Sequence, residues 1–169
     1  MYGDNAALLR HVDILVVDEI SMVRADLFDA MAQLMKRYGR KRSQPFGGIQ
    51  LCLMGDLLQL PPVVGTAESD LFHSFYAGAG VMYSRSWEQA ACVNVEFTDI
   101  FRQKDPQFIH ALNQVRCGQA EGSILQYLNQ RHVPQALIPT DAVVLTARVA
   151  TADAINQRML QSLPAKPVT

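Results

Sequence analysis

Two apolar stretches decide the fold of this chain: Ile14-Leu-Val-Val-Asp-Glu-Ile-Ser-Met22 and Leu51-Cys-Leu-Met-Gly-Asp-Leu-Leu-Gln-Leu-Pro-Pro62. Each is a short apolar run that ends abruptly in polar residues, which is the pattern of a buried parallel strand. Ligands of doubly wound α/β sheets bind beyond the carboxyl ends of the strands. We therefore expect Asp18 and Glu19 at the end of one strand, with Gly55, Asp56 and Gln59 at the end of another.

Paired acids after a buried strand suit a nucleoside triphosphatase. One carboxylate can hold Mg²⁺, and the next can orient or deprotonate the attacking water. The structural alternative for Asp18 is a helix cap, and for the second stretch it is a plain turn after a strand. A plain turn, however, does not require Gln59.

The composition limits the possible functions. The chain has 169 residues, is 49% hydrophobic and carries a net charge of −1, so nucleic-acid binding would need a local basic patch. Its three cysteines include no C-x-x-C pair and are expected to be reduced, partly buried thiols. The histidines lack metal-ligand spacing, and neither a signal peptide nor a membrane-spanning run is apparent. The expected location is the cytoplasm or another reducing compartment.

The pattern of apolar residues predicts α/β layers. Strands are expected over 12–17, 49–54, 93–97 and 143–145, a helix over 24–38, and short helical pieces over 66–92. Asp105-Pro106 predicts a helix start and Gly118 its end, while Thr151 is expected to cap the last helix. A shift in composition near residues 90–95 indicates two truncated domains, 1–92 and 93–169.

Two further segments carry charges that could act on phosphates. Arg102, in Phe97-Thr-Asp-Ile-Phe-Arg-Gln103, is either a surface arginine bonded to carbonyls or an arginine finger that reaches across a cleft. A basic cluster comprises Arg37, Arg40, Lys41 and Arg42. It fits a helix C-terminus followed by a solvated loop, and the alternative is contact with a DNA backbone.

Taken in order, these pieces resemble the Pif-type DNA helicases of superfamily one, which are relatives of the RecD-type helicases. Asp18-Glu-Ile-Ser-Met22 resembles the second helicase motif (Walker B), the stretch from Phe46 to Val63 the third, and Phe101-Arg-Gln103 the fourth. Leu145-Thr-Ala-Arg-Val-Ala-Thr-Ala-Asp-Ala-Ile-Asn156 is similar to a later stretch of that family's second motor domain. The third motif is the most specific of these.

The resemblance implies RecA-like P-loop NTPase motor domains, in which a parallel sheet is flanked by helices, with ATP and Mg²⁺ as cofactors. It implies Asp18 as the Mg²⁺ ligand, Glu19 as catalytic base, Gln59 as sensor of the γ-phosphate and Arg102 as arginine finger. Its implied activity is 5′-to-3′ translocation on single-stranded DNA, with unwinding of duplex or folded DNA in repair, recombination or telomere maintenance.

The sequence departs from the family pattern in one large respect. It contains no G-x-x-x-x-G-K-[ST], because none of its four lysines follows a glycine. We therefore expect a fragment that lacks the remaining helicase segments and is inactive alone. Two alternatives stay open: a motor within a multidomain relaxase or exonuclease, and a non-catalytic module that keeps the motor fold.

Overall fold

The computed structural model describes residues 7–134, 137–139 and 142–163. The chain forms two compact units, one up to Ile124 and one from Leu125 onward, and each is described by itself. The predicted boundary between motor domains at residues 92 and 93 is a different kind of division and stays a prediction.

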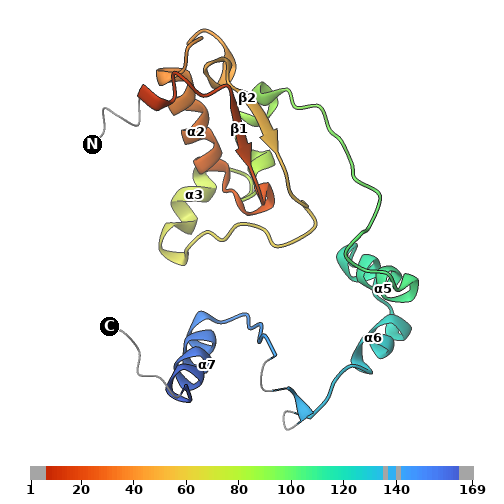
Figure 1. Ribbon diagram of the computed structural model, residues 1–169. Coiled ribbons are helices and arrows are strands. Elements are labelled where there is room, and N and C mark those ends of the chain that lie inside the picture. Colours follow the sequence, from red (N-terminus) through yellow and green to blue (C-terminus); the bar gives the residue numbers. More distant parts are fainter. Residues whose placement is uncertain (1–6, 135–136, 140–141, 164–169) are drawn as a thin grey trace. The chain divides into compact units, whose positions relative to one another are not determined.

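The first unit is built on a parallel strand pair joined by a helix (Figure 1). Strand β1 (Ile14–Val17) pairs with β2 (Gln50–Leu53), with Leu15 opposite Leu51 and Val17 opposite Leu53. Between them lie the short helix η1 (Ile20–Met22), helix α2 (Ala25–Tyr38) and the turn η2 (Pro45–Gly48). The predicted parallel strands and the helix over 24–38 are therefore confirmed.

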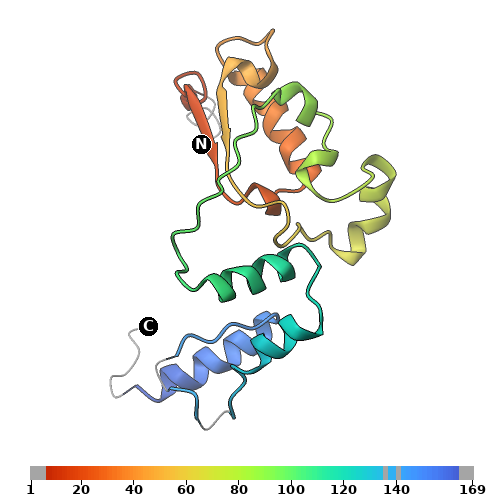
Figure 2. The same cartoon turned by 90° about the vertical axis from the view of Figure 1, so that its right-hand side faces the viewer.

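Helix α2 packs against one face of the sheet (Figure 2), and the core lies between the two. The ring of Phe28, which is fully buried, lies 5.4 Å from that of Phe46 and 6.0 Å from that of Trp87. Leu15, Val17, Leu51 and Leu53 pack against this cluster from the strands.

The other face of the sheet is exposed in the described part of the chain, so the prediction of buried strands is wrong for that face. Ile14 is 53% exposed and Val16 is 55% exposed. Strand side chains alternate between faces, and the described helices cover only one face. The predicted partial burial of the cysteines is also wrong, because Cys52, Cys92 and Cys117 are all exposed.

Short helices follow β2, as the sequence predicts for residues 66–92. They are η3 (Thr66–Glu68), α3 (Ser69–Phe75), η4 (Val81–Tyr83) and α4 (Trp87–Ala90). The strand predicted over 93–97 does not form: Val93 is 89% exposed and Phe97 is 91% exposed. A strand needs a hydrogen-bonding neighbour, and alternating side chains alone do not supply one.

Helix α5 (Pro106–Arg116) begins where the sequence predicts. The carboxylate of Asp105 accepts hydrogen bonds from the backbone N–H groups of Gln107 (2.9 Å) and Phe108 (3.2 Å). These bonds satisfy donors that the helix leaves unpaired. Gly118 follows the helix with a φ of +67°, the left-handed conformation that glycine adopts at helix ends.

Helix α6 (Gly122–Asn129) spans the division between the units, and α7 (Val149–Gln161) belongs to the second. The prediction that Thr151 caps the last helix is wrong, because Arg148 occupies the N-cap position. The strand predicted over 143–145 is also absent from this described segment, where Val143 and Leu145 are 89% and 92% exposed.

A buried carboxylate in α2 forms hydrogen bonds with the segment that contains the short helices. Asp29 is only 5% exposed and accepts hydrogen bonds from the Tyr76 hydroxyl (2.9 Å), the Ser86 N–H (2.8 Å) and the Arg85 N–H (3.2 Å). Burial alone would raise the pKa of Asp29, but these hydrogen bonds outweigh it and lower the pKa. Asp29 therefore stays ionised and holds residues 76–86 in place.

We expect Asp29→Ala to lower the free energy of unfolding by roughly 2–4 kcal/mol, because three hydrogen-bond donors lose their acceptor. The folded-state pKa of Asp29 is depressed. Its contribution is therefore complete above the unfolded pKa of about 3.9 and is lost as the pH falls through the folded value. Urea denaturation at pH 7 and pH 3 measures both effects, with the exposed Asp70→Ala as control. Equal losses in the two variants would contradict the assignment.

Candidate active site

The two acids lie directly after β1, as predicted. The Oδ1 atom of Asp18 accepts a hydrogen bond from the Glu19 N–H (2.9 Å). Glu19 has φ 53° and ψ 45°, a left-handed conformation that is costly for a residue with a side chain. Phe46 and Ala91 also have a positive φ, but the Phe46 ring is buried and Ala91 ends helix α4. The Glu19 side chain is exposed, so core packing does not explain its conformation, and strain of this kind gathers at functional sites.

The backbone after β2 holds this turn in place. Met54 donates its N–H to the Val17 carbonyl (2.8 Å), and Ile20 donates its N–H to the Met54 carbonyl (2.9 Å). A Cβ added to Gly55 would lie 2.9 Å from the Ile20 nitrogen and 3.4 Å from the Glu19 carbonyl carbon. Only glycine permits this approach, which brings the second and third motifs together at one edge of the sheet.

Gln59 lies in a turn that Asp56 organises. The Gln59 N–H donates to the Asp56 carbonyl (3.0 Å), and the Gln59 Nε2 donates to Asp56 Oδ2 (3.1 Å). The Asp56 carboxylate also forms an ion pair with Arg116 of α5, with 2.7 Å between Oδ2 and Nε. Sequence reasoning placed Asp56 at the strand end without a role and missed Arg116 entirely. A lone arginine in the last turn of a helix gives no signal beyond favourable interaction with the helix dipole.

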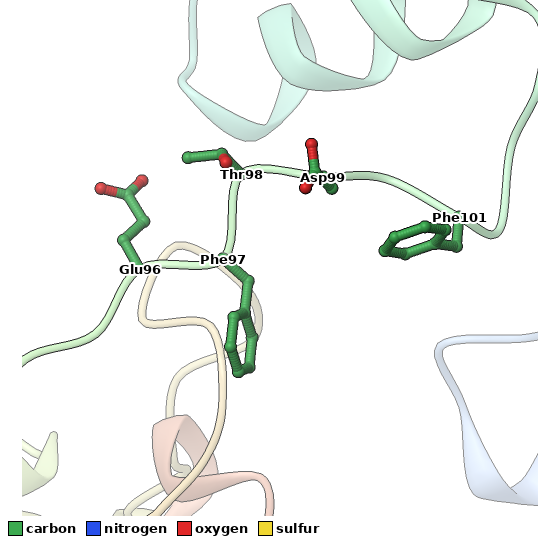
Figure 3. A pocket seen from close by; sticks show the side chains of 5 residues that line it. All are labelled: Glu96, Phe97, Thr98, Asp99 and Phe101. Carbon is green, nitrogen blue, oxygen red and sulfur yellow. The ribbon is translucent and has the colours of Figure 1, made fainter.

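Arg102 lies at a bend in a segment without helix or strand, not after a strand as predicted. It is exposed and forms no ion pair within the described part of the chain. Just before it, a surface hollow of about 490 Å³ is lined by Glu96, Phe97, Thr98, Asp99 and Phe101. Figure 3 shows the two phenylalanine rings reaching into the open space beside this segment, apart from the acidic groups. The role of Arg102 as an arginine finger that reaches a phosphate across a cleft stays a prediction.

The structure favours the structural explanation for half of the basic cluster. Arg40 forms an ion pair with Asp13, and the Arg37 guanidinium lies 5.3 Å from the centre of the Tyr38 ring. Lys41 and Arg42 remain exposed. Contact with DNA by these four residues stays a prediction.

The donor set at the strand ends fits Mg²⁺ bound together with a nucleotide. Mg²⁺ commonly uses one or two carboxylates and completes its coordination with phosphate oxygens and waters. Asp18 offers one oxygen that no backbone group occupies among the described residues. The described residues contain no cluster of three or more His, Cys, Asp or Glu side chains that could hold a metal ion. Among the described helices, none is long and apolar enough to cross a membrane.

Known proteins are similar to this chain over most of its length. A family model described as "PIF1-like helicase" matches residues 3–128. The human ATP-dependent DNA helicase PIF1 is 37% identical over 155 residues, which are 90% of this chain and 22% of that protein. The ATP-dependent DNA helicase RRM3 of Saccharomyces cerevisiae is 34% identical, over 95% of this chain and 21% of its own length. The chain thus spans about a fifth of the length of these curated relatives.

Solved structures agree. Pif1 helicase from Bacteroides in complex with ADP-AlF3 and ssDNA matches with a TM-score of 0.83 at 30% identity, over 96% of this chain and 38% of that one. Pif1 helicase from Candida albicans matches with a TM-score of 0.79 at 29% identity, over 98% of this chain and 35% of that one. The fold is that of part of a RecA-like helicase motor, and the chain belongs to the PIF1-like helicase family.

Proposed function

We propose that a longer protein containing this chain is an ATP-dependent DNA helicase that moves 5′ to 3′ on single-stranded DNA. The observation that carries the proposal is the junction of two motifs at one sheet edge. There, the strained Glu19 follows β1, and Gly55, which follows the neighbouring strand β2, packs against its backbone. We propose that this arrangement fixes the backbone of Glu19 so that its carboxylate lies near the γ-phosphate of a bound ATP.

Each site residue has a proposed role. Asp18 would bind the Mg²⁺ that accompanies the nucleotide, and Glu19 would take a proton from the attacking water. Gln59 would contact the γ-phosphate or its water, and Arg102 would stabilise the charge that develops in the transition state. The similarity to a Pif1 crystallised with ADP-AlF3 supports binding of a nucleotide.

DNA is the proposed macromolecular partner, because a related Pif1 helicase was crystallised with ssDNA, and another solved structure concerns DNA unwinding at forked dsDNA by Pif1 helicases. Within the basic cluster, Lys41 and Arg42 are the better candidates for phosphate contacts, since Arg40 is already paired with Asp13. The proposed roles lie in DNA repair, recombination or telomere maintenance. A reducing intracellular compartment suits the three free, exposed cysteines.

Comparing two proteins tests the proposal: the full-length protein and the 169-residue chain alone. With Mg²⁺ and ATP, the full-length protein should unwind a duplex that carries a 5′ single-stranded tail and should hydrolyse ATP faster when DNA is present. The isolated chain contains no phosphate-binding loop and should hydrolyse ATP negligibly. A full-length protein without DNA-stimulated hydrolysis would refute the proposal. Turnover by the isolated chain that Glu19→Gln abolishes would instead refute the expectation that this chain is inactive alone, since the phosphate loop would then be dispensable.

A further inference from the structure

The Asp56 carboxylate is the centre of a small network that joins the third motif to helix α5. Arg116 donates two hydrogen bonds to it: Nε lies 2.7 Å from Oδ2 and Nη2 lies 3.1 Å from Oδ1. The Leu58 N–H donates to Oδ1 (3.0 Å), and the Gln59 Nε2 donates to Oδ2 (3.1 Å). The carboxylate therefore accepts four hydrogen bonds, and all of these residues lie in the first compact unit.

This network sets which way the Gln59 amide faces. The hydrogen bond from Arg116 lowers the pKa of Asp56 to about 2, against an opposing effect of burial and with further help from Leu58 and Gln59. Asp56 is thus ionised at neutral pH and can only accept hydrogen bonds. The amide nitrogen of Gln59 must face Asp56, which leaves Oε1 and one N–H for another partner.

We propose that Asp56, held by Arg116, is a positioning residue that orients the Gln59 carboxamide toward the γ-phosphate of ATP or its attacking water. This inference rests on the proposed function. Of the two remaining groups on Gln59, the N–H can donate to a phosphate oxygen and Oε1 can accept from a water. A carboxamide that rotated freely would present the wrong group in part of the population.

Helix α5 gives this network a second consequence. The helix starts at Pro106, shortly after Arg102, and carries Arg116 in its last turn. Ala111, in the middle of the helix, is fully buried. Helix α5 therefore connects the segment of the proposed arginine finger to the residue that holds the proposed γ-phosphate sensor.

Stability alone does not account for the pair. The side chains of Arg116 and Asp56 are 42% and 22% exposed, and ion pairs at such positions contribute little to folding. Arg116→Met should therefore leave the melting temperature nearly unchanged while it frees the Gln59 amide. A residue that acted only on folding would, when replaced, lower the melting temperature and leave the Gln59 amide in place.

The first experiment observes Gln59 directly in the 169-residue chain. In proton–nitrogen NMR spectra, the Gln59 side-chain amide should be shifted and protected from exchange in the wild type. It should move to the position of a solvated amide in Arg116→Met and in Asp56→Asn. The control is Arg158→Met, which removes an arginine from the last turn of another helix, α7. An unshifted Gln59 signal in Arg116→Met would overturn the proposal.

The second experiment measures hydrolysis in the full-length protein. Arg116→Met should lower DNA-stimulated kcat by about 10- to 100-fold, with little change in the KM for ATP, because a misplaced group costs rate rather than binding. Arg116→Lys should restore only part of the loss, since lysine lacks the planar fork. In a Gln59→Ala background, Arg116→Met should have no further effect, because Arg116 acts through Gln59.

The outcomes separate this inference from the proposed function. If Glu19→Gln abolishes hydrolysis while Arg116→Met retains full kcat, the helicase assignment stands and the positioning role is wrong. Additive losses from Gln59→Ala and Arg116→Met would likewise overturn it. If the wild-type protein hydrolyses no ATP, the proposed function fails and the catalytic part of the inference fails with it. The NMR spectra then still decide whether Arg116 fixes the amide.

Discussion

Replacing Arg102 with alanine in the full-length protein should lower DNA-stimulated kcat by about 10³- to 10⁵-fold, the range measured for arginine fingers. The guanidinium would stabilise charge that develops only in the transition state, so the KM for ATP should change little. The side chain is exposed and forms no ion pair within the described residues, so the melting temperature should stay near the wild-type value.

Two further variants sharpen this test. Lys104→Ala removes another exposed cation from the same segment and should retain most of the activity. Arg102→Lys should recover little, because lysine keeps the charge but loses the bidentate geometry. Full kcat in Arg102→Ala would rule out the arginine-finger role. A variant that unfolds would mean that Arg102 is a structural residue.

Glu19→Gln should lower kcat by about 10²- to 10⁴-fold, which is what a general base contributes. Glutamine has the same shape but cannot take the proton, so nucleotide binding should persist while hydrolysis stops. Equilibrium binding of a fluorescent ATP analogue, measured beside steady-state turnover, separates the two effects. The exposed Glu88→Gln serves as the control and should behave as wild type.

The backbone at Glu19 adds a second readout. Glycine adopts the left-handed conformation without steric cost, so Glu19→Gly should not lower the melting temperature although it removes the carboxylate. Loss of activity without loss of stability would identify Glu19 as a residue kept for chemistry. If Glu19→Gly instead destabilises the fold, its side chain supports the structure and the role of catalytic base is in doubt.

Local patterns in the sequence predicted much of the first unit. The helix over 24–38 agrees with α2 within one residue, and Asp105-Pro106 marks the start of α5. These features depend on neighbours a few residues away, such as the cap at Asp105, so they can be read from a short window. The parallel pairing of β1 and β2 could also be predicted from the sequence, because a helix that connects two neighbouring apolar strands normally joins parallel ones.

Predictions that needed a distant partner failed. The segments 93–97 and 143–145 have strand-like sequences but form no strand in the described structure. Strand formation depends on a neighbouring strand, and alternation of side chains does not identify one. The exposed face of β1 has the same explanation, since burial of an apolar strand depends on what covers it.

The sequence by itself determined the family and placed Asp18, Glu19, Gln59 and Arg102 in motifs, because residue types and their spacing suffice for that recognition. Only the tertiary structure decided which side chains hold others in place. The pairs Asp29–Ser86 and Asp56–Arg116 join residues 57 and 60 positions apart. Such contacts exist only after the chain has closed long loops around a packed core, and no local pattern encodes which acid will meet which donor.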